Sequence, residues 1–305
     1  MIGGPAITKT DLPLKLFAKG KVRDTYEIGA DKLLMVATDR ISAFDRVLPN
    51  GIPDRGKVLT QLSVFWFSQT DTFQENHLVS GMVPDLPLAL RDHRHELAGR
   101  FMIVRKAKRI DFECVVRGYM AGSAWKEYQD SHTLAGEEMP PGLRQSEKLA
   151  YPIFSPATKA ESGHDENITF TQLKKELGDE LATKMRDSSL ELYKFASDLS
   201  ARRGLILADT KFEFGLIGDG LILIDEALTP DSSRFWESAT YQIGTSPDSY
   251  DKQFVRDWLS KSGWDKESDP PELPPDVVAQ TRDRYLTAYE RLVGKPLFPP
   301  KARNE

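Results

Sequence analysis

Two apolar strands joined by a tight glycine turn constrain this fold more than any other feature. Residues 205–214 and 221–226 are rich in Leu, Ile and Phe, and Gly218-Asp219-Gly220 separates them. A short turn of this composition between two apolar runs predicts an antiparallel hairpin. Residues 22–28 and 32–38 form a second such pair. Because the strands come in hairpins rather than in strict alternation with helices, we predict an α+β fold of antiparallel sheets with flanking helices.

The other segments add helices and one long loop to this prediction. Apolar residues at helical spacing predict a helix within 57–73. The same reasoning predicts helices over 169–177, 179–203, 250–261 and 275–293, strands over 101–104 and 112–116, and a short helix that Ser123 would cap. Residues 131–168 hold four prolines and show little periodicity. We expect them to form a long functional loop.

Composition excludes several classes of protein. The 305 residues are 40% hydrophobic and 29% charged, which is typical of a folded globular chain of one or two lobes. No apolar run approaches the ~18–20 residues that span a bilayer, and we expect no secretory signal. The net charge of -5 argues against nucleic-acid binding. The single cysteine cannot form an internal disulfide, so we expect a cytoplasmic protein with no membrane partner.

Charged residues on the 205–226 hairpin suggest a metal site. If the turn centres on Asp219, then Glu213 faces Asp225 across the hairpin, with Cβ atoms ~4.5–5.5 Å apart. Alternation would place Asp209, Lys211 and Glu213 on one face. Paired carboxylates together with phosphate oxygens are the usual ligands of Mg²⁺. The alternative is a solvated face with a cross-strand charge pair, and a shift of one residue in register would break the proposed pair.

Three segments have the composition of anion sites. Gly20-Lys21-Val22-Arg23 places a glycine and basic groups between two strands, which suits a phosphate, although it matches neither common glycine-rich phosphate motif. A basic surface turn is the alternative. Arg117 leaves a strand just before a glycine and a candidate helix start, which suits a phosphate monoester or a simple strand end.

The third segment is 229–236, where small hydroxyl side chains precede Arg234. It is typical either of an anion-binding loop or of an ordinary Pro-Asp turn. By contrast, Cys114 lies within an apolar strand with no histidine beside it. We therefore expect a buried, inert thiol there.

At these same residues the chain resembles a known family. The segments LADTKFEFG at 207–215 and RIDFECVVRGYMAGS at 109–123 resemble the two signatures of the SAICAR synthetase family. Further blocks that resemble the family lie at 20–24, 37–45, 122–126, 164–167 and 225–236, so the resemblance runs from about residue 15 to residue 290. Asp111 stands where many members carry proline. The loop lengths are similar to those of fungal single-function members.

The resemblance implies an ATP-dependent ligase of purine biosynthesis. Such an enzyme joins L-aspartate to the carboxylate of carboxyaminoimidazole ribonucleotide (CAIR), giving SAICAR, ADP and phosphate through an acyl phosphate. The fold implied is two-lobed and related to ATP-grasp. We expect a β-rich lobe over 1–108 that covers ATP and a larger lobe over 109–305 with the Mg²⁺, ribonucleotide and aspartate sites. We expect a monomer rather than a dimer.

The resemblance also implies a role for particular residues. It assigns Glu213 and Asp225 to Mg²⁺, and Lys211 and Lys21 to nucleotide phosphates. It assigns Arg117, Ser123 and Arg234 to the ribonucleotide phosphate, with Asp209 near the imidazole substituents, and Lys252 and Arg256 to substrate carboxylates. The strand over 101–106, with Arg105 and Lys106, would hold adenine. Gly20, Val22 and Arg23 would line the nucleotide, and Asp39, Arg40, Ser42 and Lys159 would line the cleft.

Two other classes of protein stay open on the sequence alone. A small-molecule kinase with the same ATP site would release a stable phosphorylated product and would need no amine acceptor. A nucleotide-binding protein without activity would lack a metal carboxylate, whereas both Glu213 and Asp225 are present.

Overall fold

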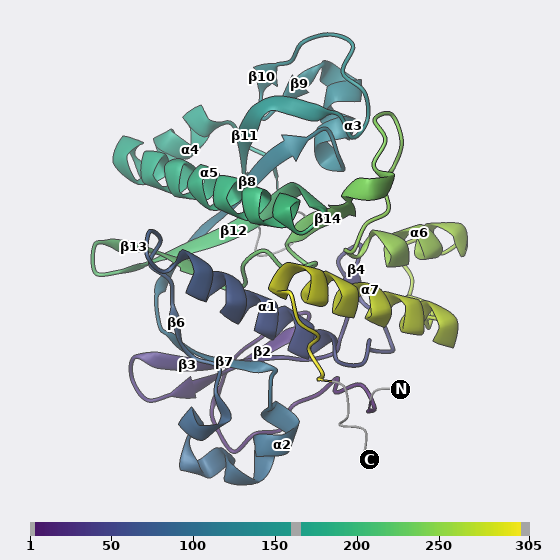
Figure 1. The fold of residues 1–305 in the computed structure, drawn as a ribbon. Helices are drawn as coiled ribbons and strands as arrows, with labels where there is room; N and C mark the ends of the chain where they lie inside the picture. Colours follow the sequence, from purple (N-terminus) through teal and green to yellow (C-terminus); the bar gives the residue numbers. More distant parts are fainter. Residues whose placement is uncertain (1–3, 160–165, 300–305) are drawn as a thin grey trace. The chain divides into compact units, whose positions relative to one another are not determined.

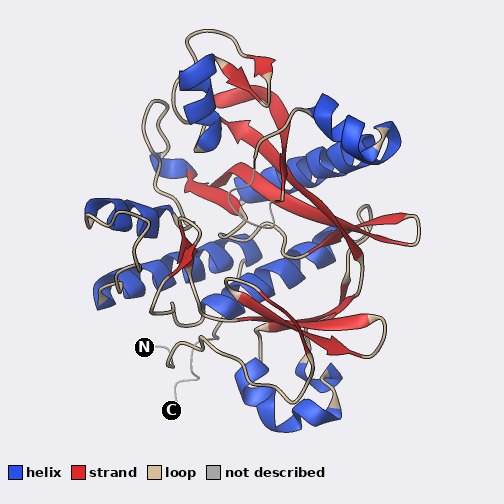
Figure 2. Ribbon diagram, turned by 180° about the vertical axis from the view of Figure 1, so that it is seen from behind, coloured by secondary structure: helices blue, strands red, loops and turns tan. Residues whose placement is uncertain are grey.

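The computed structural model describes residues 4–159 and 166–299, and its fold is α+β, as predicted (Figures 1 and 2). The chain divides into two compact units. The first combines Met1–Phe65, Ser80–Ile103 and Tyr250–Glu305, and the second combines Trp66–Val79 and Val104–Ser249. This division differs from the expected lobes 1–108 and 109–305, because the C-terminal segment belongs with the first unit.

A five-stranded antiparallel sheet organises the first unit. Its order is β1 (Leu16–Lys19), β2 (Arg23–Ile28), β3 (Lys32–Ala37), β7 (Phe101–Arg105) and β6 (Leu78–Ser80), with the chain crossing between the units at β6 and β7. The predicted hairpin is confirmed, because Arg23 pairs with Ala37 and Ile28 with Lys32. Leu34, Val36 and Phe101 of this sheet are buried in one cluster with Leu90 and Leu97, which attaches the segment that follows β6 to the sheet.

The C-terminal helices explain why their segment belongs to the first unit. Helices α6 (Gln253–Lys261) and α7 (Pro275–Val293) bury Val255, Leu259 and Val277 in one cluster with Ile41 and Ile52. The short hairpin β4 (Ser42–Ala43) and β5 (Arg46–Val47) lies in the same unit. Helix α1 (Arg55–Thr70) starts there, and η1 (Val83–Asp85), η2 (Leu88–His93) and α2 (Arg94–Leu97) complete it.

The second unit is built on a sheet of long strands. Its order is β11 (Lys148–Thr158), β8 (Lys108–Tyr119), β12 (Leu205–Ile217) and β13 (Gly220–Ile224), and β14 (Ser233–Glu237) also pairs with β12. Helix α5 (Asp179–Arg202) lies across one face of this sheet beside α4 (Phe170–Leu177), as Figure 1 shows. Cys114 and Phe212 are buried on that face. Because side chains alternate along a strand, the neighbouring residues of β8 and β12 point to the opposite face of the sheet, where polar groups lie.

The prediction of a long loop over 131–168 is wrong for residues 133–134, 137–138 and 148–158, which form strands. Residues 148–158 form β11, and β9 (Thr133–Leu134) and β10 (Glu137–Glu138) form a small hairpin before it. The prolines of β11 are tolerated because it is an edge strand, where one row of amide groups has no partner strand. Pro152 lies where the register with β8 shifts, between Lys148 and Ile153.

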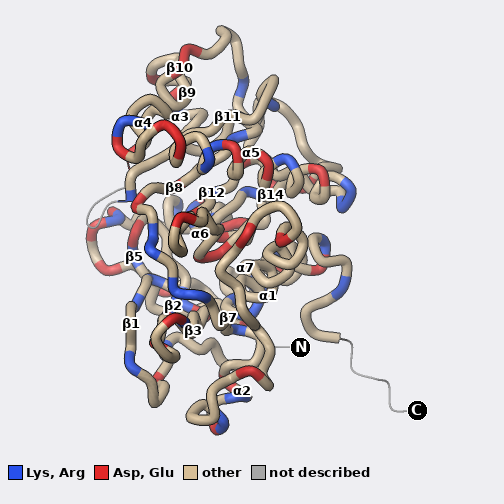
Figure 3. Tube along the Cα trace, turned by 90° about the vertical axis from the view of Figure 1, so that its left-hand side faces the viewer, with Lys and Arg blue, Asp and Glu red and all other residues tan. Residues whose placement is uncertain are grey.

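Charged residues of both signs occur on elements of both units (Figure 3). Within the described residues, no helix combines the length and the apolar character needed to cross a membrane.

Candidate active site

The pairing of β8 with β12 brings two charged clusters to one face of the second unit. Arg117 is the register partner of Asp209, and Glu113 is the partner of Glu213. Lys211 Nζ lies 3.4 Å from Glu213 Oε1, so these two side chains do share a face, as predicted. Four residues along a strand span about 13 Å, at ~3.3 Å per residue. The two clusters are therefore neighbours along a single strand.

The first cluster surrounds the Lys211 ammonium with carboxylates. Lys211 forms an ion pair with Glu113, and Lys159 forms one with Glu213. Glu113 and Glu213 are buried and directly opposed, which would be destabilising without cations between them. Burial alone would lower the pKa of Lys211, but the charges of Glu213, Glu113 and Asp225 outweigh it and raise the pKa. Lys211 is therefore a fixed cation.

The predicted pairing of Glu213 with Asp225 is wrong by one residue. Glu213 pairs with Ile224, because the turn holds two residues between Ile217 and Gly220 rather than three centred on Asp219. Gly218 has φ +58°, which such a tight turn requires. Asp225 instead follows the end of β13 with φ +65°. The charge of Asp225 still contributes to the raised pKa of Lys211.

The second cluster joins two arginines to one carboxylate. Arg117 is 4% exposed; its Nη2 donates to Ser123 Oγ at 3.0 Å and its Nη1 lies 4.0 Å from Asp209 Oδ2. Arg234 forms an ion pair with the same Asp209. Burial, opposed by Asp209 and assisted by Arg234, lowers the pKa of Arg117. The Arg117 Nε is buried and donates to no group in the described structure. Two guanidinium groups and one carboxylate leave a net positive charge, which suits an anion.

Gly122 allows this arrangement. It is the N-cap of α3 (Ser123–Ser131) and has φ +55°, so the prediction that Ser123 caps the helix is wrong. A Cβ on Gly122 would lie 2.4–2.8 Å from the Arg234 guanidinium, so only glycine lets that side chain pack there. Ser123, freed from capping, accepts the Arg117 hydrogen bond. The N-terminus of α3 adds the positive end of a helix dipole, which favours an anion.

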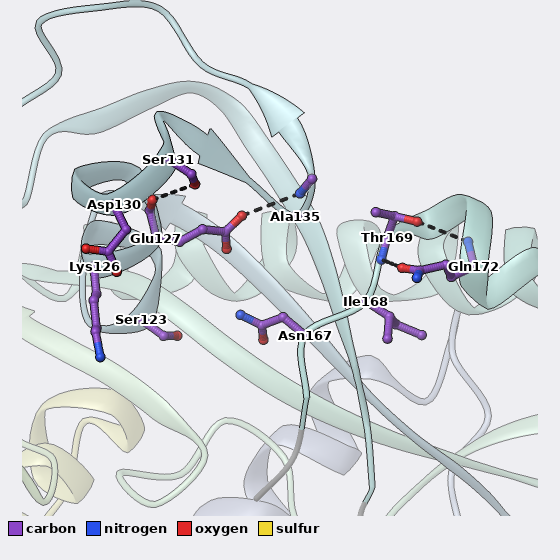
Figure 4. A pocket seen from close by; sticks show the side chains of 11 residues that line it. Ser123, Lys126, Glu127, Asp130, Ser131, Ala135, Asn167, Ile168, Thr169 and Gln172 are labelled. Atoms are coloured by element: carbon purple, nitrogen blue, oxygen red, sulfur yellow. Dashed lines mark hydrogen bonds between the residues drawn. The ribbon is translucent and has the colours of Figure 1, made fainter.

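A pocket of about 480 Å³ adjoins the arginine cluster through Ser123. Its walls are α3, the turn between β9 and β10, and residues 167–172. Figure 4 shows Ser123 and Asn167 directed towards each other across it. Glu127 Oε1 accepts from Thr133 Oγ1 at 3.2 Å and from Gly136 N at 3.4 Å, which fixes one wall. The arginine cluster therefore adjoins, through Ser123, a pocket lined mainly by polar side chains.

Predicted site residues in the first unit have different partners. Lys21 pairs with Asp45, and both side chains are about half exposed. Asp39 is buried and accepts from Arg100, from Gly56 N and from Ile7 N. Arg40 donates hydrogen bonds to Gly20 O and Lys21 O, among other acceptors. The structure therefore places Asp39 and Arg40 in the framework of this unit, whereas Ser42 lies in β4.

The remaining predicted residues lie outside the two clusters. Lys252 and Arg256 are one helical turn apart at the start of α6, on the same side of it. In the second unit, Arg105 pairs with Glu75 at 2.7 Å, and Lys106 is exposed. His164, within the block at 164–167, lies outside the described residues.

Sequence reasoning missed Glu113, which completes the lysine cluster. Its position in the 112–116 strand carried the signal. Side chains alternate along a strand, so Glu113 had to share a face with Val115 and Arg117. Cys114, between them, is buried as predicted, and burial raises the pKa of its thiol to about 12.

Fold and site together define a class of protein. Buried arginines beside a polar pocket, next to a lysine held between carboxylates, are the groups that an enzyme needs to bind a phosphorylated substrate and to neutralise further negative charge. The sequence profile of the SAICAR synthetase family matches residues 16–271. The chain therefore belongs to the SAICAR synthetase family, the ligases that join L-aspartate to CAIR in purine biosynthesis.

Individual relatives agree over nearly the whole chain. A phosphoribosylaminoimidazole-succinocarboxamide synthase of Syntrophobacter fumaroxidans is 51% identical, covering 97% of this chain and 99% of the relative. That of Thermodesulfovibrio yellowstonii is 53% identical, with coverages of 92% and 96%. The SAICAR synthase of Saccharomyces cerevisiae in complex with SAICAR superposes with a TM-score of 0.87 at 44% identity, with coverages of 95% and 99%. A SAICAR synthetase in complex with ADP gives a TM-score of 0.68 at 26% identity, with coverages of 92% and 99%.

Proposed function

We propose that this ligase works through an acyl phosphate formed on the face shared by β8 and β12. The observation that carries the proposal is that two charged clusters lie along β12, with Asp209 and Glu213 about 13 Å apart at ~3.3 Å per residue and Lys211 midway between them. CAIR has a phosphate at one end and a carboxylate at the other. Arg117, Arg234 and Ser123 bind the phosphate, and Lys211 lies towards the carboxylate.

The chemistry explains why the second cluster is needed. A carboxylate is a poor acyl acceptor, because oxide would have to leave. Once the carboxylate takes the γ-phosphoryl group of ATP, phosphate becomes the leaving group and the aspartate amine can attack. Phosphoryl transfer depends mainly on positioning and on neutralising charge, which Lys211 and Lys159 supply. Cys114 does not form an acyl-enzyme, because its thiol is buried and its pKa is raised to about 12.

The same cluster fits Mg²⁺. Glu213, Glu113 and Asp225 offer the hard oxygen ligands that Mg²⁺ prefers, and the lysines now neutralise them. Within the described residues, no three acidic, histidine or cysteine side chains already form a metal-binding group. An Mg²⁺ ion is usually held by one or two carboxylates together with substrate phosphates. Glu213 and Asp225 would hold it, and the bound ion would neutralise charge on the transferred phosphoryl group.

The remaining roles are also proposals. The Gly20–Arg23 turn, with Lys21 and Val22, binds the nucleotide phosphates, and Arg105 and Lys106 lie beside the adenine. Lys252 and Arg256 bind substrate carboxylates. The lone buried thiol suits the reducing cytoplasm, where we propose that a monomer works.

An omission assay tests the function. ADP release is measured with CAIR, L-aspartate and ATP, and then with each one left out. The ligase requires all three for sustained turnover. ADP released at the full rate without L-aspartate would instead show the kinase that the sequence left open, and its product would be a stable phosphorylated CAIR.

A further inference from the structure

Every N–H group of the Arg40 guanidinium donates a hydrogen bond to another group of the protein. A guanidinium carries five N–H groups. Nε donates to Lys21 O at 3.0 Å, and Nη2 donates to Gly20 O at 3.0 Å and to Asp24 Oδ1 at 2.7 Å. Nη1 donates to Thr8 O at 2.9 Å and to Asp24 Oδ2 at 3.2 Å. Arg40 therefore has no donor left for a substrate, although the family resemblance implied a cleft residue.

Its contacts fix the direction of successive peptide groups in the turn. Arg40 binds the carbonyls of Gly20 and Lys21. The next carbonyl, that of Val22, accepts hydrogen bonds from Thr38 N at 3.0 Å and from Thr38 Oγ1 at 2.8 Å. In a trans peptide, the N–H of the next residue points away from the carbonyl. The Lys21 and Val22 amides must then point away from Arg40. Within the described parts of the chain, neither amide donates to a protein acceptor.

We propose that Arg40 is a positioning residue for the nucleotide, which pins the Gly20 and Lys21 carbonyls inward so that the Lys21 and Val22 amides face the phosphates. Adjacent amides aimed the same way attract anions, whereas a flipped peptide would present a carbonyl oxygen and repel them. The inference rests on the proposed role of this turn in nucleotide binding.

The surroundings of Arg40 suit this role. Asp24 is 2% exposed and is itself held by Thr10 Oγ1 at 2.7 Å, so the carboxylate that orients Arg40 is fixed. The bidentate pair restricts the guanidinium to one plane. Lysine could not replace it, because an ammonium has three donors and no planar fork. Among the residues that the structure describes, the Lys21 side chain pairs only with the half-exposed Asp45, a weak contact that a phosphate can displace.

The experiment measures ADP binding to Arg40→Lys. Calorimetry gives the Kd for ADP with Mg²⁺, and ¹H–¹⁵N spectra follow the Lys21 and Val22 amides during the titration. We expect the Kd to rise roughly 5- to 50-fold, which lies within the range of coupling between residues of one hydrogen-bond network. Asp24→Asn, which removes the orienting charge but keeps the shape, should act in the same direction. The matched control is Arg282→Lys, because Arg282 makes a two-bond pair with Asp54 in the same unit.

The results distinguish an error in the proposed function of the turn from an error in the positioning role of Arg40. If the Lys21 and Val22 amides of the unaltered protein do not shift with ADP, the turn does not bind phosphate and the proposed function of this segment is wrong. If they shift, but folded Arg40→Lys and Asp24→Asn bind ADP as the unaltered protein does, the positioning role is wrong. A weaker Kd in both variants and an unchanged one in Arg282→Lys supports it.

Discussion

Replacing Arg117 with alanine should weaken CAIR binding while leaving the ATP site intact. Arg117 is almost fully buried and donates to Ser123, and within the described residues its buried Nε has no hydrogen-bond partner. Hydrogen bonds between charged groups contribute ~1.5–3 kcal/mol each, and little solvent screens this one. Since ~1.4 kcal/mol is tenfold in affinity, the CAIR KM should rise roughly 10- to 100-fold. Asp209 stays paired with Arg234, so the fold should survive.

The assay is steady-state ADP release, with CAIR and ATP varied separately. Arg109→Ala is the matched control, because Arg109 lies on the same strand but forms an exposed pair with Asp111 at 2.7 Å. It should change neither KM. A rise in the ATP KM with the CAIR KM unchanged would show that the phosphate site has been placed wrongly. An unchanged CAIR KM in a folded Arg117→Ala protein would refute the reasoning altogether.

Two further substitutions probe the site, and one labelling experiment probes the core beneath it. Asp225→Asn should lower kcat at least ~10²-fold, as for loss of one preorganised charge; near-normal turnover at saturating Mg²⁺ would contradict the metal assignment. Gly122→Ala should destabilise the fold by at least ~1 kcal/mol, because its φ is positive, and should raise the CAIR KM by displacing Arg234; calorimetry and kinetics check both effects, and an unchanged CAIR KM would contradict the packing argument. Cys114 should resist iodoacetamide at pH 8 in the native state, because a raised pKa keeps the thiol protonated below about 12, and fast native labelling would contradict its burial.

Local sequence patterns predicted most helices and strands, because the ends of these elements depend on residues that are close together in the sequence. Helix α7 occupies the predicted 275–293, and α5 ends before Gly204, whose φ is +71°. The prolines of β11 misled the prediction, because their tolerance depends on whether the strand lies at a sheet edge. That property is set by the order of strands far apart in the sequence.

The site was predictable by residue type and less so by geometry. Alternation alone placed Asp209, Lys211 and Glu213 on one face. The partner of Glu213 depended on a turn of two residues instead of three, a difference that a Gly-Asp-Gly segment does not settle. The framework role of Arg40 was hidden as well, because its acceptors are mainly backbone carbonyls, which carry no sequence signal.

The fate of the carboxylate oxygen tests the acyl-phosphate route most directly. CAIR carrying ¹⁸O in both carboxylate oxygens is turned over with ATP and L-aspartate, and the released phosphate is examined by mass spectrometry. A control without enzyme establishes that the carboxylate does not exchange with water under the same conditions. If the carboxylate takes the γ-phosphoryl group, one of its oxygens must leave with that phosphate, so each phosphate should carry one ¹⁸O. Phosphate without label, formed in step with SAICAR, would contradict the mechanism even though the ligase reaction itself still ran.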